Sequence, residues 1–130
     1  MNQIRHKKFR SGLIGLGLCV TIIGALVYFF QSETFNAEAM KEAKERCDLI
    51  LFPYENAEGM AETENVIKSI KKGTSIAVFI GPEGGFAPEE VVIAEESGAK
   101  IISLGRRILR TETAAMAVLS HLMIQAETLE

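Results

Sequence analysis

Helix-forming and strand-forming segments alternate along most of the chain, and this alternation constrains the fold more than any other feature. The segments that favour helices are Ala37–Cys47, Glu62–Lys72, Pro88–Gly98 and Thr111–Glu127. Between them lie short apolar runs that favour strands, Asp48–Tyr54, Ser75–Ile80 and Ile101–Leu104. Continuous apolar strands are typical of parallel sheets covered by helices on both faces. The order predicts an open parallel α/β sheet, with ligands bound beyond the carboxyl ends of the strands.

Residues with strong positional preferences mark several predicted helix ends. Pro88 suits the first position of a helix and is followed by two glutamates, which favour a helix N-terminus. Gly98 suits the position just after that helix, and Gly73 the position after Glu62–Lys72.

Length and charge limit the classes of function. At 130 residues the chain is long enough for one domain. The first ten residues carry four of the fourteen basic residues and no acidic one, whereas the rest carries ten basic and seventeen acidic residues, a balance of −7. An acidic body argues against non-specific adhesion to nucleic acid, so an RNA partner would need a local basic patch. The two cysteines and two histidines lack the spacing of metal ligands, and no metal site is expected.

Residues 11–32 carry no charge and are about as long as a membrane-crossing helix requires. Basic residues precede this segment, so the positive-inside rule places the N-terminus in the cytoplasm. We therefore predict a basic N-terminus and a hydrophobic transmembrane helix over residues 1–32, followed by a body over residues 33–130. A signal peptide cleaved near Ala37–Ala39 is one alternative. Another alternative is a buried helix of a soluble fold. A further one is that this N-terminal segment does not belong to the ancestral product of the gene.

The loop after Ser75–Ile80 reads "GPEGGFAPEE". Gly81, Gly84 and Gly85 allow backbone angles and close approaches that side chains forbid, while Pro82 restricts the loop. A rigid loop with few side chains suits a flat ligand bound by main-chain groups. The alternative is an ordinary glycine-rich turn from strand to helix. The GxxxxGK[ST] and GxGxxG phosphate-binding patterns are both absent from the sequence.

The loop after Ile101–Leu104 contains three arginines in five residues, Arg106, Arg107 and Arg110. Arginine binds phosphates and carboxylates through paired hydrogen bonds, which favours an anion or RNA contact over a merely solvated basic loop. Thr111 or Thr113 is predicted to cap the following helix, and Glu112 suits its first turn.

Taken together, "IGPEGGF" and "SLGRRILRTETAA" resemble the C-terminal signature of the RsmE family, over roughly Ala37–Ala126. Members of this family, within the SPOUT superfamily, methylate N3 of a uridine in bacterial 16S ribosomal RNA. The resemblance implies an α/β sheet with a C-terminal trefoil knot, a homodimer, S-adenosylmethionine held in the knot and a cytoplasmic location.

The resemblance also assigns site residues by position. Arg110 and Glu112 would lie nearest the chemistry, and Arg106 and Arg107 would contact RNA phosphate. The residues implied to line the methyl donor are Ile80, Gly81, Gly85, Leu104, Gly105, Ile108, Leu109 and Arg110.

The chain departs from the family upstream of these motifs. Family members begin with an RNA-binding β-barrel and the first half of the methyltransferase domain, and here a hydrophobic segment stands in their place. The sequence therefore predicts an incomplete sheet with an open edge. The alternatives to an active enzyme are a membrane-anchored, non-catalytic module that binds an adenosyl ligand, and a remnant without function.

Overall fold

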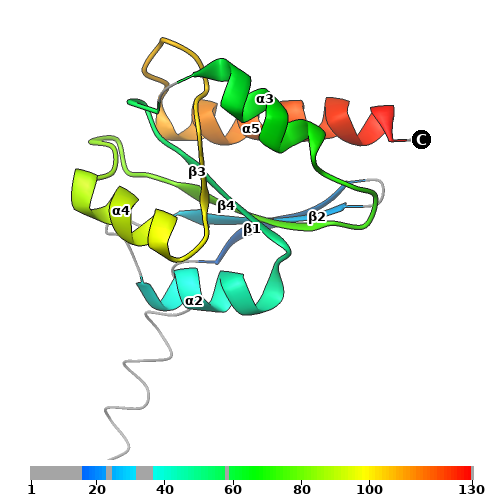
Figure 1. The fold of residues 1–130 in the computed structure, drawn as a ribbon, viewed down its shortest axis with the longest axis horizontal. Helices are drawn as coiled ribbons and strands as arrows, with labels where there is room; N and C mark the ends of the chain where they lie inside the picture. The colour runs from blue at the N-terminus through cyan, green and yellow to red at the C-terminus, as the bar shows by residue number, and fades with distance from the viewer. Residues whose placement is uncertain (1–15, 23–24, 32–36, 58, 130) are drawn as a thin grey trace, which may run out of the picture.

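The structure is a computed structural model that describes residues 16–22, 25–31, 37–57 and 59–129. The predicted alternation of helices and strands from Ala37 onward is confirmed, as Figure 1 shows. The elements in this part are α2 (Ala37–Arg46), β3 (Leu49–Pro53), α3 (Met60–Lys68), β4 (Ser75–Ile80), α4 (Pro88–Glu96), β5 (Lys100–Ile102) and α5 (Thr111–Thr128).

The strands form one five-stranded sheet in the order β1-β2-β4-β3-β5. The pairs β2–β4, β4–β3 and β3–β5 are all parallel, and β1 (Leu16–Ile22) runs antiparallel to β2 (Ala25–Gln31). The predicted parallel α/β sheet is therefore confirmed. The carboxyl ends of β3, β4 and β5 meet at one edge, where the sequence predicts a ligand.

The predicted transmembrane helix over residues 11–32 is wrong for the part that the structure describes. Two seven-residue strands occupy Leu16–Ile22 and Ala25–Gln31, and β2 pairs with β4 from Leu26–Ser75 to Gln31–Ile80. No helix among the described residues is long and apolar enough to span a bilayer. The sequence "CVTI" and "LVYFF" is rich in β-branched and aromatic residues, which favour strands when a partner strand is available.

Strand β2 pairs with β4 along its whole length, so β4 lies inside the sheet, and the predicted open edge stays a prediction. Residues 1–15, 23–24 and 32–36 lie outside the described part of the chain, and with them lie the basic N-terminus and both ends of the predicted hydrophobic segment. The signal-peptide alternative stays a prediction.

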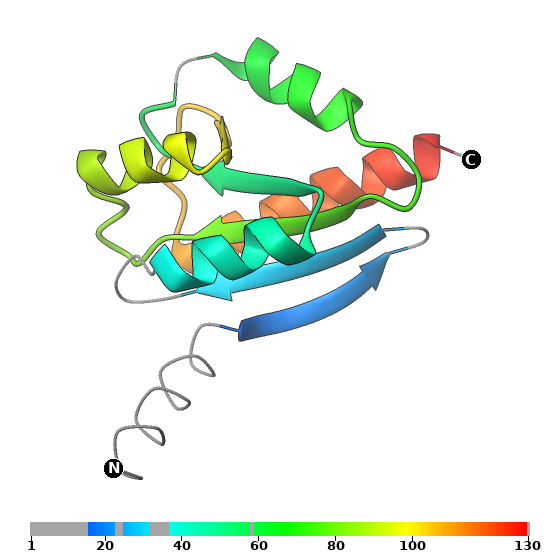
Figure 2. The same cartoon turned by 60° about the horizontal axis from the view of Figure 1, so that its bottom comes forward.

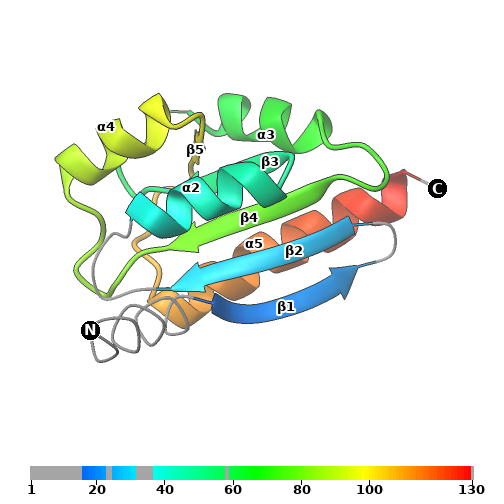
Figure 3. The same cartoon turned by 90° about the horizontal axis from the view of Figure 1, so that it is seen from below.

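Helices cover both faces of the sheet. Figure 3 looks onto it with α2 in front and α5 behind, and Figure 2 gives an intermediate view. Alternate residues of β4 divide between two cores, since Ile76, Val78 and Ile80 pack with α3 and α5, while Ala77 and Phe79 pack with α2 and α4. The sheet is thus sandwiched between two helical layers that hold its ligand-binding edge in place.

Helix α3 ends earlier than the sequence predicts. Its last residue is Lys68, and the hydroxyl of Ser69 donates a hydrogen bond to the carbonyl oxygen of Val66 at 2.6 Å. Side-chain hydrogen bonds of this kind compete with helical backbone bonds. Gly73, with φ of 84°, lies instead in the turn closed by the bond from the Thr74 N–H to the Lys71 carbonyl oxygen.

Asp48 and Ser75 join the start of β3 to the start of β4. Oδ2 of Asp48 accepts hydrogen bonds from the Ser75 backbone N–H at 2.9 Å and from the Ser75 hydroxyl at 2.7 Å. The Asp48 N–H donates to the carbonyl oxygen of Ser75 at 2.9 Å. The hydrogen bond from the Ser75 backbone, followed by that from its hydroxyl, holds the pKa of Asp48 below its usual value.

This lowered pKa predicts a pH dependence of stability. Because the pKa of Asp48 is lower in the folded chain, its stabilising effect is present above the unfolded pKa and is lost as the pH falls through the folded pKa. We expect Asp48→Asn to lower the free energy of unfolding at neutral pH and to flatten its decline between about pH 5 and pH 3. Urea denaturation across this range tests both effects. Glu95→Gln, an exposed site on α4, is the control, and identical pH profiles for Asp48→Asn and wild type would contradict the prediction.

Candidate functional site

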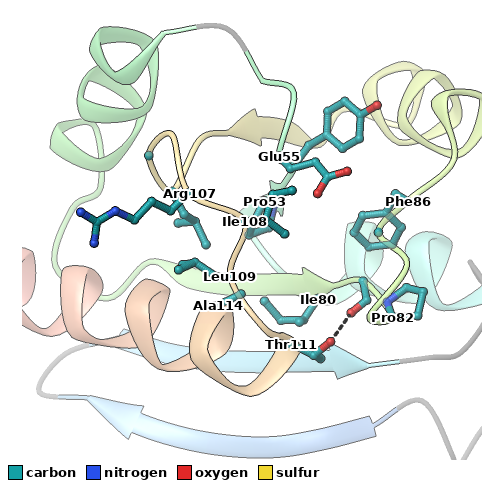
Figure 4. A pocket seen from close by; sticks show the side chains of 15 residues that line it. Pro53, Glu55, Ile80, Pro82, Phe86, Arg107, Ile108, Leu109, Thr111 and Ala114 are labelled. Atoms are coloured by element: carbon teal, nitrogen blue, oxygen red, sulfur yellow. Dashed lines mark hydrogen bonds between the residues drawn. The ribbon is translucent and has the colours of Figure 1, made fainter.

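Three loops at the carboxyl ends of β3, β4 and β5 surround a pocket that is open to solvent (Figure 4). Its empty space, including the open solvent at its mouth, is about 580 Å³. Most of its side chains are apolar or absent, so backbone groups form much of the remaining surface. The lining residues are Pro53, Tyr54, Glu55, Ile80, Gly81, Pro82, Gly85, Phe86, Leu104, Gly105, Arg107, Ile108, Leu109, Thr111 and Ala114.

The loop after β4 is held by a turn and by an aromatic stack. The Gly85 N–H donates to the Pro82 carbonyl oxygen at 2.9 Å, and Gly85 has a φ of 75°, which favours glycine. The ring of Phe86 lies so close to Gly81 that an added Cβ would meet it at 3.1 Å. Phe86 also stacks on the buried ring of Phe52, with 4.0 Å between the centroids. The glycine-rich loop after β4 is therefore fixed against the core.

Helix α4 begins directly after this loop, as the sequence predicts. Pro88 is its first residue, and the Ala87 N–H donates to the side-chain oxygen Oε2 of Glu90 at 2.7 Å. Gly98 follows its C-terminus with a φ of 93°. The predicted roles of Pro88 and Gly98 are confirmed.

The loop after β5 is tied to α3 by the buried hydroxyl of Thr63, and a second buried hydroxyl, that of Ser103, bonds within the loop. Thr63 is 2% exposed and Ser103 is 6% exposed. The Ser103 N–H donates to Oγ1 of Thr63 at 2.8 Å, and the Gly105 N–H donates to Oγ of Ser103 at 3.2 Å. Gly105 has a φ of 103° and no heavy atom within 4 Å of an added Cβ. These bonds fix the start of the loop, while its glycine faces open space at the pocket.

A hydrogen bond across the pocket joins the two loops. Oγ1 of Thr111 donates to the carbonyl oxygen of Gly81 at 3.2 Å, as the dashed line in Figure 4 shows. The prediction that Thr111 or Thr113 caps α5 is wrong, because the N-cap is Arg110, no side chain caps the helix, and Thr111 is its first residue. Buried Thr111 bonds to Gly81 instead. Glu112 lies in the first turn of α5, as predicted.

The structure brings most of the predicted site residues together. The pocket lining includes seven of the eight residues implied to bind the methyl donor, namely Ile80, Gly81, Gly85, Leu104, Gly105, Ile108 and Leu109. Arg110 and Glu112 are exposed at the start of α5 and do not line it. Of the two arginines predicted to contact RNA, both are exposed, and Arg107 lines the pocket whereas Arg106 does not. The chemical roles of these residues stay predictions.

The loop after β3 contributes residues that the motifs did not indicate. Pro53, Tyr54 and Glu55 line the pocket, and the Tyr54 N–H donates to the Ile102 carbonyl oxygen at 3.0 Å, which holds this loop beside β5. The signal for them was available, because the predicted strand Asp48–Tyr54 ends at the same sheet edge as the two glycine-containing loops.

Comparison with known proteins matches this part of the chain to a family. A family model described as the RNA methyltransferase domain matches residues 30–123, which include all three loops of the pocket. The chain belongs to this RNA methyltransferase family. The predicted resemblance to RsmE proteins is confirmed by the ribosomal RNA small subunit methyltransferase E of Bacillus subtilis (strain 168), which is 42% identical over 64 residues. This match covers 49% of the chain and 25% of that relative.

Solved structures share the fold of this RNA methyltransferase domain. A crystal structure described as that of a hypothetical protein matches with a TM-score of 0.61 and 32% identity, over 72% of the chain and 50% of that one. A Legionella pneumophila protein, solved with the bound cofactor SAM, matches with a TM-score of 0.52 and 31% identity, over 65% of the chain and 34% of that one. The chain therefore corresponds to half or less of the length of these relatives.

Proposed function

We propose that the pocket binds S-adenosylmethionine and that the chain supplies the donor-binding part of a methyltransferase acting on uridine N3 in 16S ribosomal RNA. The convergence of the β4 and β5 loops on one pocket, joined by the bond from Thr111 to Gly81, carries this proposal. The cofactor named for the Legionella pneumophila structure and the name of the Bacillus subtilis relative support it.

The pocket offers an apolar surface and hydrogen-bonding groups to different parts of S-adenosylmethionine. Ile80, Leu104, Leu109 and Ala114 form an apolar lining on which an adenine ring can pack. Backbone N–H and carbonyl groups of the glycine-containing loops can bind the edges of the base and the ribose. A site made of backbone and small apolar groups holds its shape, which favours alignment of donor and acceptor.

The reaction needs a deprotonated nitrogen in line with the methyl group. Uridine N3 carries a proton and becomes a nucleophile when that proton leaves. In the proposal Glu112 accepts this proton and the guanidinium of Arg110 stabilises the resulting anion. Both residues are exposed at the start of α5 and flank Thr111, which lines the pocket. A base displaced from folded RNA would therefore meet them at the mouth.

The RNA would be held through phosphate contacts. Arg106 and Arg107 are exposed on the β5 loop, next to the pocket, and paired hydrogen bonds from arginine suit phosphate oxygens. The rest of the body is acidic, so these arginines supply the local patch that RNA binding needs. Ribosomal RNA and the methyl donor are cytoplasmic, and the proposed location is the cytoplasm.

The homodimer and the trefoil knot belong to the same proposal. One face of α5 exposes Met116, Met123 and Ile124, with exposed fractions of 68%, 49% and 66%. An apolar stripe of this kind suits contact with a second copy of the chain. The path of the chain after β5 supports the knot. Strand β5 lies at the edge of the sheet, and the chain returns from it to α5. Residues of α5 pack in one core with those of β4.

Calorimetric titration of S-adenosylmethionine into the full chain tests the proposal, with Gly105→Ala and Gly98→Ala as a matched pair. Both glycines have positive φ and open space around an added Cβ, so each substitution introduces similar backbone strain, about 1–2 kcal/mol. Gly105 lines the pocket and Gly98 does not. We expect Gly98→Ala to keep the wild-type affinity and Gly105→Ala to weaken it about tenfold, or 1.4 kcal/mol.

A folded wild-type chain that gives no binding heat would overturn the proposal. If the donor binds, mass spectrometry of 16S ribosomal RNA incubated with the chain tests methyl transfer to uridine. Donor binding without any methylated uridine would support the non-catalytic binding module instead of the enzyme.

A further inference from the structure

Glu55 is a carboxylate that projects toward the pocket from the loop after β3. Its Oε1 lies 3.3 Å from the position that a Cβ on Gly85 would take, so the side chain reaches across to the β4 loop. Figure 4 shows the carboxylate directed to the side of the pocket where Phe86 lies. Of the described residues that line the pocket, Glu55 is the only acidic one.

The backbone on both sides of Glu55 is held in place by hydrogen bonds. The Tyr54 N–H donates to Ile102, and the Ala57 N–H donates to the Tyr54 carbonyl oxygen at 3.1 Å, which closes a turn around Glu55. The hydroxyl of Tyr54 accepts a hydrogen bond from Asn56 at 3.4 Å. Among the described residues, none forms a hydrogen bond or an ion pair with the Glu55 carboxylate. The fold therefore positions a negative group at the pocket without neutralising it.

Part of the apolar lining lies away from Glu55. Ile80, Leu109 and Ala114 gather on the side of α5 and β4, whereas Glu55 lies on the opposite side (Figure 4). Arg107 is the only basic residue among the described lining residues, and its guanidinium extends away from Glu55. A nucleoside whose base packs on Ile80, Leu109 and Ala114 can extend its other end toward Glu55.

We infer that Glu55 makes the pocket prefer the cationic methyl donor to the neutral-sulfur product. The inference rests on the proposed function. In methyl transfer the bond between sulfur and the methyl carbon breaks and the bond between N3 and that carbon forms. The electron pair of the broken bond stays on sulfur, and the proton of N3 goes to the base. Sulfur thus loses its positive charge, so the attraction to a nearby carboxylate acts on S-adenosylmethionine and ends in S-adenosylhomocysteine.

Removal of this charge tests the inference. We compare the Kd values of S-adenosylmethionine and S-adenosylhomocysteine by calorimetry in wild type, Glu55→Gln and Glu83→Gln. Glu83 is an exposed carboxylate in the β4 loop that does not line the pocket, so its variant controls for the loss of one negative charge. We expect Glu55→Gln to reduce the preference for the donor by about twofold to fivefold, as for a solvent-accessible charge pair, and Glu83→Gln to leave it unchanged.

The possible outcomes distinguish failure of this inference from failure of the proposed function. Equal weakening of both ligands in Glu55→Gln would overturn the charge preference and indicate instead a hydrogen bond to a part that the ligands share, such as the ribose. Unchanged Kd values for both ligands in Glu55→Gln would overturn it as well. If the folded wild type binds neither ligand, the proposed function itself fails, and with it the inference.

Discussion

Phe52→Ala is expected to lower the free energy of unfolding by about 3–5 kcal/mol, a large share of the stability of a small domain. Phe52 is fully buried on the sheet face that α2 and α4 cover. Its ring stacks on Phe86 at 4.0 Å and on Phe79 at 6.3 Å between centroids. An alanine would leave a cavity that these neighbours cannot fill without moving.

Urea denaturation of Phe52→Ala, with Val92→Ala as control, measures this effect. Val92 lies on α4 over the same face of the sheet but is 52% exposed, so its truncation should change the free energy of unfolding by less than about 0.5 kcal/mol. A loss below about 1 kcal/mol in Phe52→Ala would contradict the packing described here. Because Phe86 lines the pocket, the affinity for S-adenosylmethionine should fall in the same variant.

Gly81→Val is expected to weaken binding of S-adenosylmethionine by tenfold or more, about 1.4 kcal/mol, and to lower the free energy of unfolding by about 1–3 kcal/mol. A Cβ at Gly81 would lie 3.1 Å from the Phe86 ring, and valine adds two further methyl groups. The ring cannot retreat freely, because Phe52 lies against it. Either the ring or the β4 loop must move, and both line the pocket.

Gly84→Val provides the matched control for Gly81→Val. Gly84 lies in the same loop, has no heavy atom within 4 Å of an added Cβ and does not line the pocket. Calorimetric titration of the methyl donor should give wild-type affinity for Gly84→Val. Equal affinity in the two variants would show that crowding at Gly81 does not disturb the ligand site.

The sequence predicted the elements from Ala37 onward because local signals mark them. Pro88 and Gly98 bound α4 at the positions that their backbone preferences favour. The apolar runs of β3 and β4 are buried on both faces, which explains their unbroken hydrophobicity.

The secondary structure of the hydrophobic N-terminal segment could not be predicted in the same way. A charge-free run such as residues 11–32 is compatible with a membrane helix and with two strands, because composition alone does not show what pairs with it. The partner that decides the matter is β4, whose residue Ser75 pairs with Leu26 from a distant part of the sequence.

The two motifs predicted the part of the site that their own residues form. Gly81 and Gly105 stand on loops that the order of elements brings to one edge of the sheet. Thr111 was expected to act locally as a cap, but its hydroxyl donates instead to the Gly81 carbonyl oxygen, in the loop after β4. Glu55 belongs to no motif, and the parallel pairing of β3 with β4 and β5 brings it to the pocket.

Strand β4 lies between β2 and β3, and the parts of the sheet on its two sides have different roles. Its pairing with β3 joins residues much closer in sequence than its pairing with β2, so the unit of β3, α3 and β4 closes the shorter loop. Among the described residues, the loops that line the pocket follow β3, β4 and β5. Strand β2 thus serves the site through its backbone pairing with β4, which holds in place the strand that carries Ile80 to the pocket.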